Sequence, residues 1–455
     1  MEPQHLRFGG GAAGTVLHPL VAVQALIAIT LILCLRRKYA IVPFILAVFT
    51  ISVGQVVVVA GIHFTVLRIL ILSGLVRMLV SKQPRFPGGF TAIDRLVTLW
   101  AFSSLVIVSI QLMEAQAFIK NLGDFLDLLG GYYVVRFLIR DLQDVKLATK
   151  ALAAVAVVMG LCMINEQITH WNVFGMLNGD SAIPQIRDGK LRSEGAFDVY
   201  IDAGVFGAAL VPMLVWLWSD RKSRFAAFLG LMGAVTMMLT CNSSTPILAF
   251  AGGAFALCLW RFRSRMRIFR WGLALTLLAL HLVMNAPVWS LIARVDLTGS
   301  SSGYHRYYLV DNCIRHFSDW WLLGYKDFGN WGWDMWDLSD QYVAVCLTGG
   351  LITFVIFIAL LSRSFGMLGT ARKRSAATGN RKQEWFCWCL GCTLFAHVVG
   401  WFGCSYMAKM EMTLSILLAT ISAAILEVKR AQEVPGKALE KTYIPPVLDA
   451  VEAWV

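Results

Sequence analysis

The stretch VLHPLVAVQALIAITLILCL, residues Val16–Leu35, decides the class of this protein. It is almost entirely apolar, and about 20 such residues make a helix that crosses a hydrocarbon core about 30 Å thick. Three basic residues, Arg36-Arg37-Lys38, follow it where a signal peptide would carry a small-residue cleavage site. The stretch is also too long for a signal-peptide core. We therefore expect it to remain as a membrane anchor.

Similar apolar runs recur along the whole chain of 455 residues, which is 58% hydrophobic and only 15% charged. Only helices satisfy their backbone hydrogen bonds within one membrane-crossing segment. The pattern therefore predicts an all-α, polytopic helical membrane protein with about 12–13 transmembrane helices. The predicted spans begin near Val16, Tyr39, Phe64, Ala92, Gly123, Leu147, Val199, Phe225, Thr245, Trp271, Gln341, Trp385 and Met410.

Basic residues gather on alternate connections, at 36–38, 82–85, 140–146, 221–224, 261–270, 363–382 and 429–430. The positive-inside rule makes these connections cytoplasmic. Residues 1–430 then form a single transmembrane domain with external loops 166–198 and 291–340, and 431–455 is a cytoplasmic tail. The N-terminus is external if there are thirteen spans. We expect Ser301 and Gly179 outside, and Ser223, Ser264 and Ala376 on the cytoplasmic side.

The same distribution explains the net charge of +12, so we expect no nucleic-acid partner. Ten cysteines raise the question of a metal site or a disulfide framework. Most of them lie in apolar spans, where a thiol behaves as a small hydrophobe. Cys313 is the only one squarely within the large external loop, and a disulfide needs a pair. We predict packing thiols, with no metal site.

The loop from Leu291 to Asp340 carries the densest set of polar and aromatic residues. Val310, Cys313, Ile314, Phe317, Trp320 and Trp321 recur at helical spacing, and Asp311, Asn312, Arg315, His316 and Asp319 fall mostly on the opposite face. This pattern predicts an amphipathic helix along the outer membrane interface. Ser300-Ser301-Ser302 offers it an N-cap.

Arg306 lies one turn before Val310, on the predicted buried face and in the first helical turn. A cation there opposes the helix dipole. It suits an anion that docks at the helix start, because free amides and a guanidinium then converge on that anion. The alternative is an arginine that reaches a lipid phosphate at the interface.

A second external arginine, Arg192, directly precedes the span that begins near Val199. Asp202 lies inside that span, so we expect its carboxylate to face protein or water rather than lipid. Arg192 could instead form a surface ion pair with Glu194 or Asp198.

Several short motifs then appear in a fixed order. They are Arg192-x-x-Gly195-x-Phe197 before a span, Gly303-x-x-Arg306 early in the large loop, Gly324 near its middle, Asp337-Leu338-Ser339-Asp340-Gln341-Tyr342 near its end, the turn Thr348–Ile352 and the stretch Thr65–Arg77. In order and predicted sidedness this set resembles the O-antigen ligase/polymerase superfamily of membrane glycosyltransferases. The resemblance covers roughly Phe64–Leu361.

The resemblance implies an enzyme of the bacterial inner membrane that acts at the external face on undecaprenyl-pyrophosphate-linked glycan. Its partners would be that glycan, membrane lipid and other polysaccharide-assembly proteins, with no cofactor and no metal. Arg192 and Arg306 match the family's external arginines, and Arg315 is a third candidate for the pyrophosphate. Guanidinium groups can stabilise that leaving group electrostatically. A general base would deprotonate the acceptor hydroxyl.

The candidates for the base are Asp337, then Asp340, and His305. Family ligases typically carry a histidine near the end of the external loop, where this chain has the two aspartates. That departure favours a polymerase or another glycan transferase over a ligase. Both aspartates could instead cap the following span. Two other functions stay open: a transporter or flippase for lipid-linked sugars, and a non-catalytic component of polysaccharide assembly.

Overall fold

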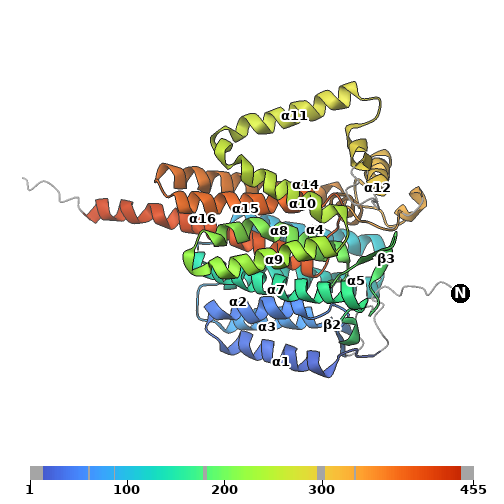
Figure 1. The fold of residues 1–455 in the computed structure, drawn as a ribbon, viewed down its shortest axis with the longest axis horizontal. Helices are drawn as coiled ribbons and strands as arrows, with labels where there is room; N and C mark the ends of the chain where they lie inside the picture. Colours follow the sequence, from blue (N-terminus) through green and yellow to red (C-terminus); the bar gives the residue numbers. More distant parts are fainter. Residues whose placement is uncertain are drawn as a thin grey trace, which may run out of the picture.

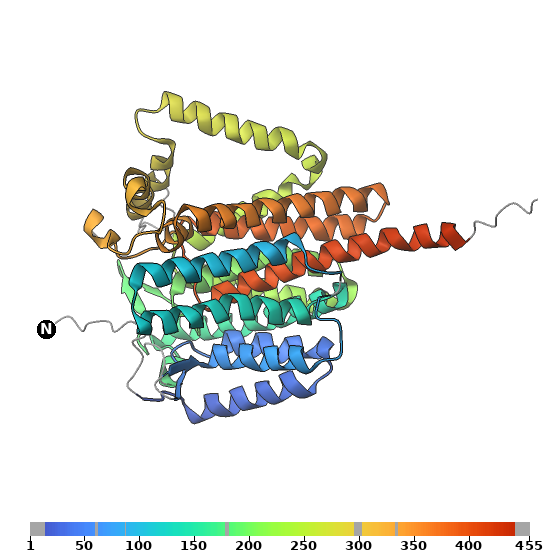
Figure 2. The same cartoon turned by 180° about the vertical axis from the view of Figure 1, so that it is seen from behind.

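The computed structural model describes residues 14–59, 62–86, 88–177, 182–294, 303–332 and 335–441, and for 432–441 it describes the helix alone. Long helices run side by side in one bundle, with loops gathered at its two ends (Figures 1 and 2). Gly179, Ser301 and the predicted Ser300–Ser302 cap lie outside the described residues, as does the end of the tail from residue 442.

The first seven helices are α1 (Pro19–Cys34), α2 (Arg37–Thr50), α3 (Val66–Val80), α4 (Ala92–Leu112), α5 (Ala115–Phe125), α6 (Gly131–Leu138) and α7 (Leu142–Thr169). The others are α8 (Tyr200–Trp218), α9 (Arg224–Thr240), α10 (Ser244–Cys258), α11 (Met266–Val283), α12 (Gly303–Arg315), α13 (Phe317–Trp320), α14 (Gln341–Ala377), α15 (Arg381–Gly400) and α16 (Lys409–Lys441). Short turns are η1 (Leu126–Gly130), η2 (Gly175–Leu177), η3 (Arg221–Ser223), η4 (Leu259–Arg265), η5 (Val288–Arg294) and η6 (Phe328–Trp331). Every predicted span start falls within a helix or at most three residues before one.

Seven helical stretches among the described residues are long and apolar enough to cross a membrane. They are α4, α7, α8, η3 with α9, α10 through α11, α14, and residues 409–431 of α16. This number is lower than the predicted 12–13, in part because α1, α2 and α3 have only 16, 14 and 15 residues. The protein is an all-helical bundle of multi-pass membrane character.

Small residues bring the central helices into close contact. A Cβ added at Gly233 of α9 would lie 2.4 Å from the carbonyl oxygen of Ala156 on α7. A Cβ at Gly207 of α8 would lie 2.6 Å from the carbonyl oxygen of Ala234 on α9. Close backbone approach through small residues is how helices associate in lipid, where burial of apolar surface gives no driving force between them.

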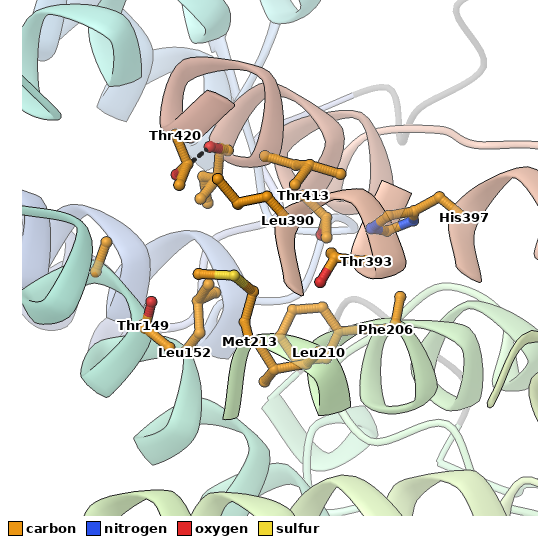
Figure 3. Close-up of a pocket in the computed structure, with 14 residues that line it drawn as sticks. Thr149, Leu152, Phe206, Leu210, Met213, Leu390, Thr393, His397, Thr413 and Thr420 are labelled. Atoms are coloured by element: carbon orange, nitrogen blue, oxygen red, sulfur yellow. Dashed lines mark hydrogen bonds between the residues drawn. The ribbon is translucent and has the colours of Figure 1, made fainter. Parts of the chain in front are cut away.

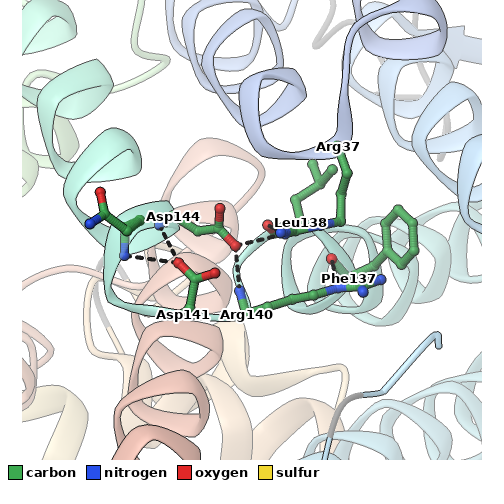
Figure 4. A network of polar contacts seen from close by, with 7 residues as sticks. Arg37, Phe137, Leu138, Arg140, Asp141 and Asp144 are labelled. Carbon is green, nitrogen blue, oxygen red and sulfur yellow. Dashed lines mark hydrogen bonds and ion pairs between the residues drawn. The ribbon is translucent and has the colours of Figure 1, made fainter. Parts of the chain in front are cut away.

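At one end of the bundle, arginines bind the carbonyl groups that helix ends leave unpaired (Figure 4). Arg37 donates to Asp144 at 2.7 Å and also to the carbonyl of Leu138, at the end of α6. Arg140 Nε donates to the carbonyl of Phe137 at 3.0 Å. Cations at helix C-termini are favoured by the helix dipole, so these contacts join α2, α6 and α7.

Further ion pairs join the other basic connections. Lys146 contacts Asp220 at 3.0 Å, which ties the start of α7 to the turn before α9. Arg263 contacts Glu384 at 2.7 Å, which ties η4 to α15. Several of the connections that the sequence assigns to the cytoplasm are therefore tied to neighbouring helices by ion pairs. The membrane side on which they lie stays a prediction.

The opposite end carries two β-hairpins that the all-α prediction did not include. They are β1 (Val56–Val59) with β2 (Ile62–Thr65), and β3 (Gln185–Arg187) with β4 (Lys190–Arg192), both antiparallel. Asp188 and Gly189 form the turn of the second hairpin, with φ of 50° and 71°. An Asp-Gly pair favours this two-residue turn because it tolerates positive φ at both positions. The hairpin ends at Arg192.

The predicted fifth span contains two carboxylates, and the fold pairs both with one arginine. Arg68 of α3 donates to Asp124 and Asp127, each at 2.9 Å. A π-helical turn, η1, follows α5 at this point. Pairing of this kind is what makes charges tolerable near the membrane interior.

The predicted amphipathic helix is α12 followed by α13, but its faces differ from the expectation. Cys313 and Trp320 are buried as predicted, whereas Ile314 and Phe317 are exposed and Asp311 is buried. The helix packs against both α14 and η5, and η5 covers part of the face that was predicted to be polar. In both views α11 stands away from the bundle (Figures 1 and 2), and each of its residues after Met266 is exposed.

Candidate functional site

Arg192 is placed by the chain that directly follows it. Glu166, near the end of α7, accepts the backbone N–H groups of Glu194 at 3.0 Å and of Gly195 at 2.8 Å. Gln167 Nε2 donates to the carbonyl of Leu191 at 3.1 Å. Because both sides of the arginine are tied to α7, its position is set by the fold. Arg192 is buried, with only 3% of its surface exposed.

The two candidate arginines both lie near the start of α8. Arg192 Nη1 donates a hydrogen bond to Tyr200 Oη, and its guanidinium carbon lies 4.6 Å from the centre of the Tyr200 ring. Arg306 lies against Gly403, and the next residue, Cys404, donates to Asp202 of α8. Residues 114 positions apart in the sequence therefore approach the same end of α8. The ligand that they would share stays a prediction.

Arg306 is buried on α12, as the helical spacing predicts, and is 7% exposed. It lies against Gly403, in the turn between α15 and α16, and a Cβ at that position would stand 2.8 Å from both Nε and Cζ of the arginine. Among the described residues, Arg306 Nε has no hydrogen-bond partner. Burial lowers the pKa of Arg306, but an arginine stays charged at neutral pH.

A buried N–H group without an acceptor costs about 1–3 kcal/mol. The cost is larger for a charged donor, because the charge has also left water. A phosphate oxygen would remove this cost, since guanidinium donors and phosphate acceptors match in geometry and charge. The unpaired Nε–H of Arg306 is thus the feature at this end of the bundle that most directly indicates a bound anion.

Asp340 is the N-cap of α14 and is fully buried. Its Oδ1 accepts the backbone N–H groups of Tyr342 at 2.8 Å and of Val343 at 3.0 Å, so the capping alternative is confirmed for this residue. Burial raises the pKa of Asp340 to about 7, against the opposing effects of these hydrogen bonds and of Arg306. Its charge beside Arg306 therefore changes near neutral pH.

His305 and Asp337 meet although 32 positions separate them. The Nε2 atom of His305 lies 3.1 Å from the backbone oxygen of Asp337 and 4.0 Å from its Oδ2. The Asp337 side chain is 52% exposed, so an acceptor can approach it. The fold therefore brings His305, near the start of the loop, next to Asp337 near its end, where the sequence itself has aspartates and no histidine.

Arg315 does not join the other two arginines. Its Nε donates to Asp311 Oδ2 at 2.6 Å, and its side chain is 68% exposed. It follows Arg306 by nine residues on one helix, which is about 13 Å along the axis. The helical spacing had placed Arg306 on the buried face and Arg315 on the polar face of this helix, and the structure agrees.

Two features beside the arginines were not singled out as site residues from the sequence. Lys409 begins α16, is buried, and its Nζ donates to the carbonyl of Ala196, four residues after Arg192. The sequence feature that could have revealed Lys409 is that it is a single lysine in a predicted external connection that is otherwise poor in cations. Cys404 Sγ donates to Asp202 Oδ1 at 2.7 Å, which confirms that Asp202 faces protein.

The large loop is anchored on a break in α14. Gly350 has φ of 61° and interrupts the helix, and a Cβ there would lie 2.7 Å from the carbonyl oxygen of Leu322. The freed N–H of Leu351 donates to the carbonyl of Trp321 at 2.9 Å. Hydrogen bonds to the loop backbone thus replace those that α14 loses at its break, and they hold residues 321–325 against the bundle.

A small, mostly apolar cavity lies deeper in the bundle, between α7, α8, α15 and α16 (Figure 3). Its volume is about 40 Å³, and four threonines and His397 are among the residues that line it. Thr149, Thr413 and Thr420 donate their hydroxyl hydrogens to backbone carbonyls. The hydroxyl of Thr393 is buried and has no partner among the described residues. The polar groups on its wall suit a few water molecules, which need such partners in a cavity.

We expect Thr393→Val to lower the free energy of unfolding by about 1 kcal/mol, because valine keeps the shape but removes a hydrogen bond to cavity water. Thermal unfolding in detergent would measure this difference, with Thr393→Ser as a control that keeps the hydroxyl. A valine variant more stable than the parent would mean that the cavity is dry and that the threonine hydroxyl is unsatisfied.

No protein-family model matches the chain, and a search of curated protein sequences found no significant match. The resemblance to the O-antigen ligase/polymerase superfamily therefore rests on the order and predicted sidedness of the sequence motifs alone.

Proposed function

We propose that the protein is a membrane glycosyltransferase of the O-antigen ligase/polymerase type. It would transfer a glycan from undecaprenyl pyrophosphate to an acceptor hydroxyl at the external face of a bacterial inner membrane. The observation that carries this proposal is that Arg192 and Arg306 both lie near the start of α8, with a buried N–H of Arg306 that has no acceptor among the described residues.

The two arginines would bind the pyrophosphate and stabilise the charge that grows on it as the glycosidic bond breaks. Groups aimed at developing charge in a buried site act strongly, because they need no reorganisation during the reaction. Tyr200 keeps one face of the Arg192 guanidinium in place. The burial of both side chains excludes water, which would otherwise weaken the interaction.

The acceptor side of the site would be the pair formed by Asp337 and His305. An exposed carboxylate next to an imidazole can take the proton of an approaching hydroxyl. Asp340 is less suited, because one of its oxygens caps α14 and the residue is fully buried. Asp337 therefore stays ahead of Asp340 as the candidate base.

We expect Asp337→Asn to lower the turnover of glycan transfer by about a hundredfold, since an amide cannot accept the proton. The measurement uses purified protein in liposomes with lipid-linked oligosaccharide, and follows release of undecaprenyl pyrophosphate. Asp340→Asn is the matched comparison, because asparagine still caps a helix well and should leave more activity. Full activity in Asp337→Asn would exclude this residue as the base.

A transporter of lipid-linked sugars is the main alternative. Transporters more often place polar groups at mid-bilayer, whereas Arg192 and Asp337 lie in loops that connect the helices. This placement supports an enzyme over a sugar pathway through the bundle. The liposome assay separates the alternatives, because a transporter moves the lipid-linked glycan unchanged and a non-catalytic assembly component neither moves nor consumes it.

A further inference from the structure

Arginines from three separate elements lie around the ends of α1 and α6, at the basic end of the bundle. Arg77 of α3 donates to two carbonyl groups at the end of α1, one of them that of Leu35. Arg37 begins α2, two residues beyond Leu35, and donates to the carbonyl of Leu138. Arg140 follows Leu138 by two residues (Figure 4). The two helix ends therefore link Arg37, Arg77 and Arg140 into one arginine cluster.

The carboxylates beside the arginine cluster are already engaged by the fold. Asp144 Oδ2 accepts the side chain of Arg37 at 2.7 Å and the backbone N–H of Arg140 at 3.1 Å. Asp141 Oδ1 caps α7 by accepting two backbone N–H groups, each at 2.9 Å. Among the described residues, neither Arg77 nor Arg140 forms an ion pair with a carboxylate. The cluster thus carries positive charge that its own carboxylates do not neutralise.

Arg140 also has a donor that the protein leaves unpaired. Its Nε donates to the carbonyl of Phe137 at 3.0 Å, and its guanidinium carbon lies 4.7 Å from the centre of the Phe137 ring (Figure 4). Its Nη2 is buried and has no hydrogen-bond partner among the described residues. The contacts with Phe137 hold the guanidinium in place and leave Nη2 for another acceptor. A phosphate oxygen matches such a donor in both geometry and charge.

The surface beside the arginine cluster favours a phosphate that belongs to a lipid. Exposed apolar side chains flank it: Leu33 near the end of α1 and Val76 and Val80 on α3, with exposed fractions of 43%, 51% and 78%. Val80 lies one helical turn beyond Arg77. Acyl chains cover apolar surface of this kind, and basic pockets between membrane helices bind anionic headgroups. A free phosphate ion would gain nothing from the apolar surface.

We propose that Arg37, Arg77 and Arg140 form a binding site for the headgroup phosphate of an anionic phospholipid. Arg140 Nη2 donates to a phosphate oxygen, while Arg37 and Arg77 keep their carbonyl contacts and supply positive charge. The acyl chains of the lipid lie against the exposed faces of α1 and α3. The site depends neither on glycan transfer nor on the side of the membrane to which this end of the bundle belongs.

The first test compares three probes on the full-length protein, purified in detergent and stripped of lipid. Thermal unfolding is followed as phosphatidylglycerol, phosphatidylcholine or inorganic phosphate is added. A ligand that binds only the folded state raises Tm. We expect phosphatidylglycerol to raise Tm by a few degrees and to act at a concentration about tenfold lower than phosphatidylcholine, which has no net charge. An equal response to the two lipids, or to inorganic phosphate and phosphatidylglycerol, would overturn the proposal.

The second test locates the lipid. Arg140→Gln removes the unpaired donor and its charge, but an amide can still donate to the carbonyl of Phe137. We expect about tenfold more phosphatidylglycerol to be needed for half of the Tm shift, because a charge-assisted hydrogen bond is lost. The matched control is Arg224→Gln, since Arg224 is exposed and its Nε also donates to a carbonyl, that of Trp218, at 3.3 Å.

An unchanged lipid response in Arg140→Gln would also overturn the proposal. A water molecule between Arg140 Nη2 and Asp144 Oδ1, which is buried and unpaired as well, would then satisfy both groups. If Arg140→Gln does not fold, the comparison of the three probes on the parent protein still decides, because it needs no variant.

Discussion

We expect Arg306→Lys to lower the turnover of glycan transfer by about a hundredfold, while expression and membrane insertion stay close to those of the parent protein. Lysine keeps the charge but loses the planar fork that grips two phosphate oxygens. Removing one positioned donor to a developing negative charge commonly costs on the order of 3 kcal/mol of barrier. The measurement is turnover in liposomes with lipid-linked oligosaccharide, and Arg192→Lys should behave in the same way.

The matched control for Arg306→Lys is Arg315→Lys on the same helix. Arg315 is exposed and paired with Asp311, so its replacement should change activity little. Near-parent transfer by Arg306→Lys or Arg192→Lys would contradict the pyrophosphate site. The two arginines would then be anchors of the loops that carry them.

Gly403→Ala should lower transfer by at least about tenfold, although this residue contacts no substrate in the proposed mechanism. Its new methyl group would stand 2.8 Å from two atoms of the Arg306 guanidinium and 2.4 Å from Thr245 Oγ1. The guanidinium is the end of a flexible side chain, so it can move away while the fold persists. A displacement of about 1 Å at a catalytic group can cost about a hundredfold in rate.

The control for Gly403→Ala is Gly391→Ala in the middle of α15, where an added Cβ would meet no atom within 4 Å. Both variants should keep the parent's Tm within a few degrees, and only Gly403→Ala should lose turnover. Equal activity in the two variants would mean that the exact position of Arg306 does not matter for transfer.

Particular residues show why parts of this fold could be predicted. The apolar run Val16–Leu35 predicted a helix, and α1 occupies most of it, because a run of this length has no other way to satisfy its backbone in lipid. The position of Arg306, one turn before Val310, predicted its burial, because helical periodicity is a local property of the chain.

Other residues show where local patterns stop. The polar face predicted for α12 includes Asp311, which is buried because η5 covers that side and Trp289 donates to its carboxylate at 3.1 Å. The hairpin that ends at Arg192 had a sequence signal in Asp188-Gly189, which an all-helical interpretation passed over.

The sequence by itself determined the membrane class, the helices and the separation of basic connections from the two arginine-bearing loops. These follow from hydrophobic length, backbone hydrogen bonding and charge, which act over at most a few turns of helix. Only the tertiary structure decided that Arg192 and Arg306 both lie near the start of α8 and that His305 meets Asp337. Those contacts depend on how α7, α8, α12 and α14 pack, and helix packing is fixed by side-chain fit between segments that the sequence places far apart.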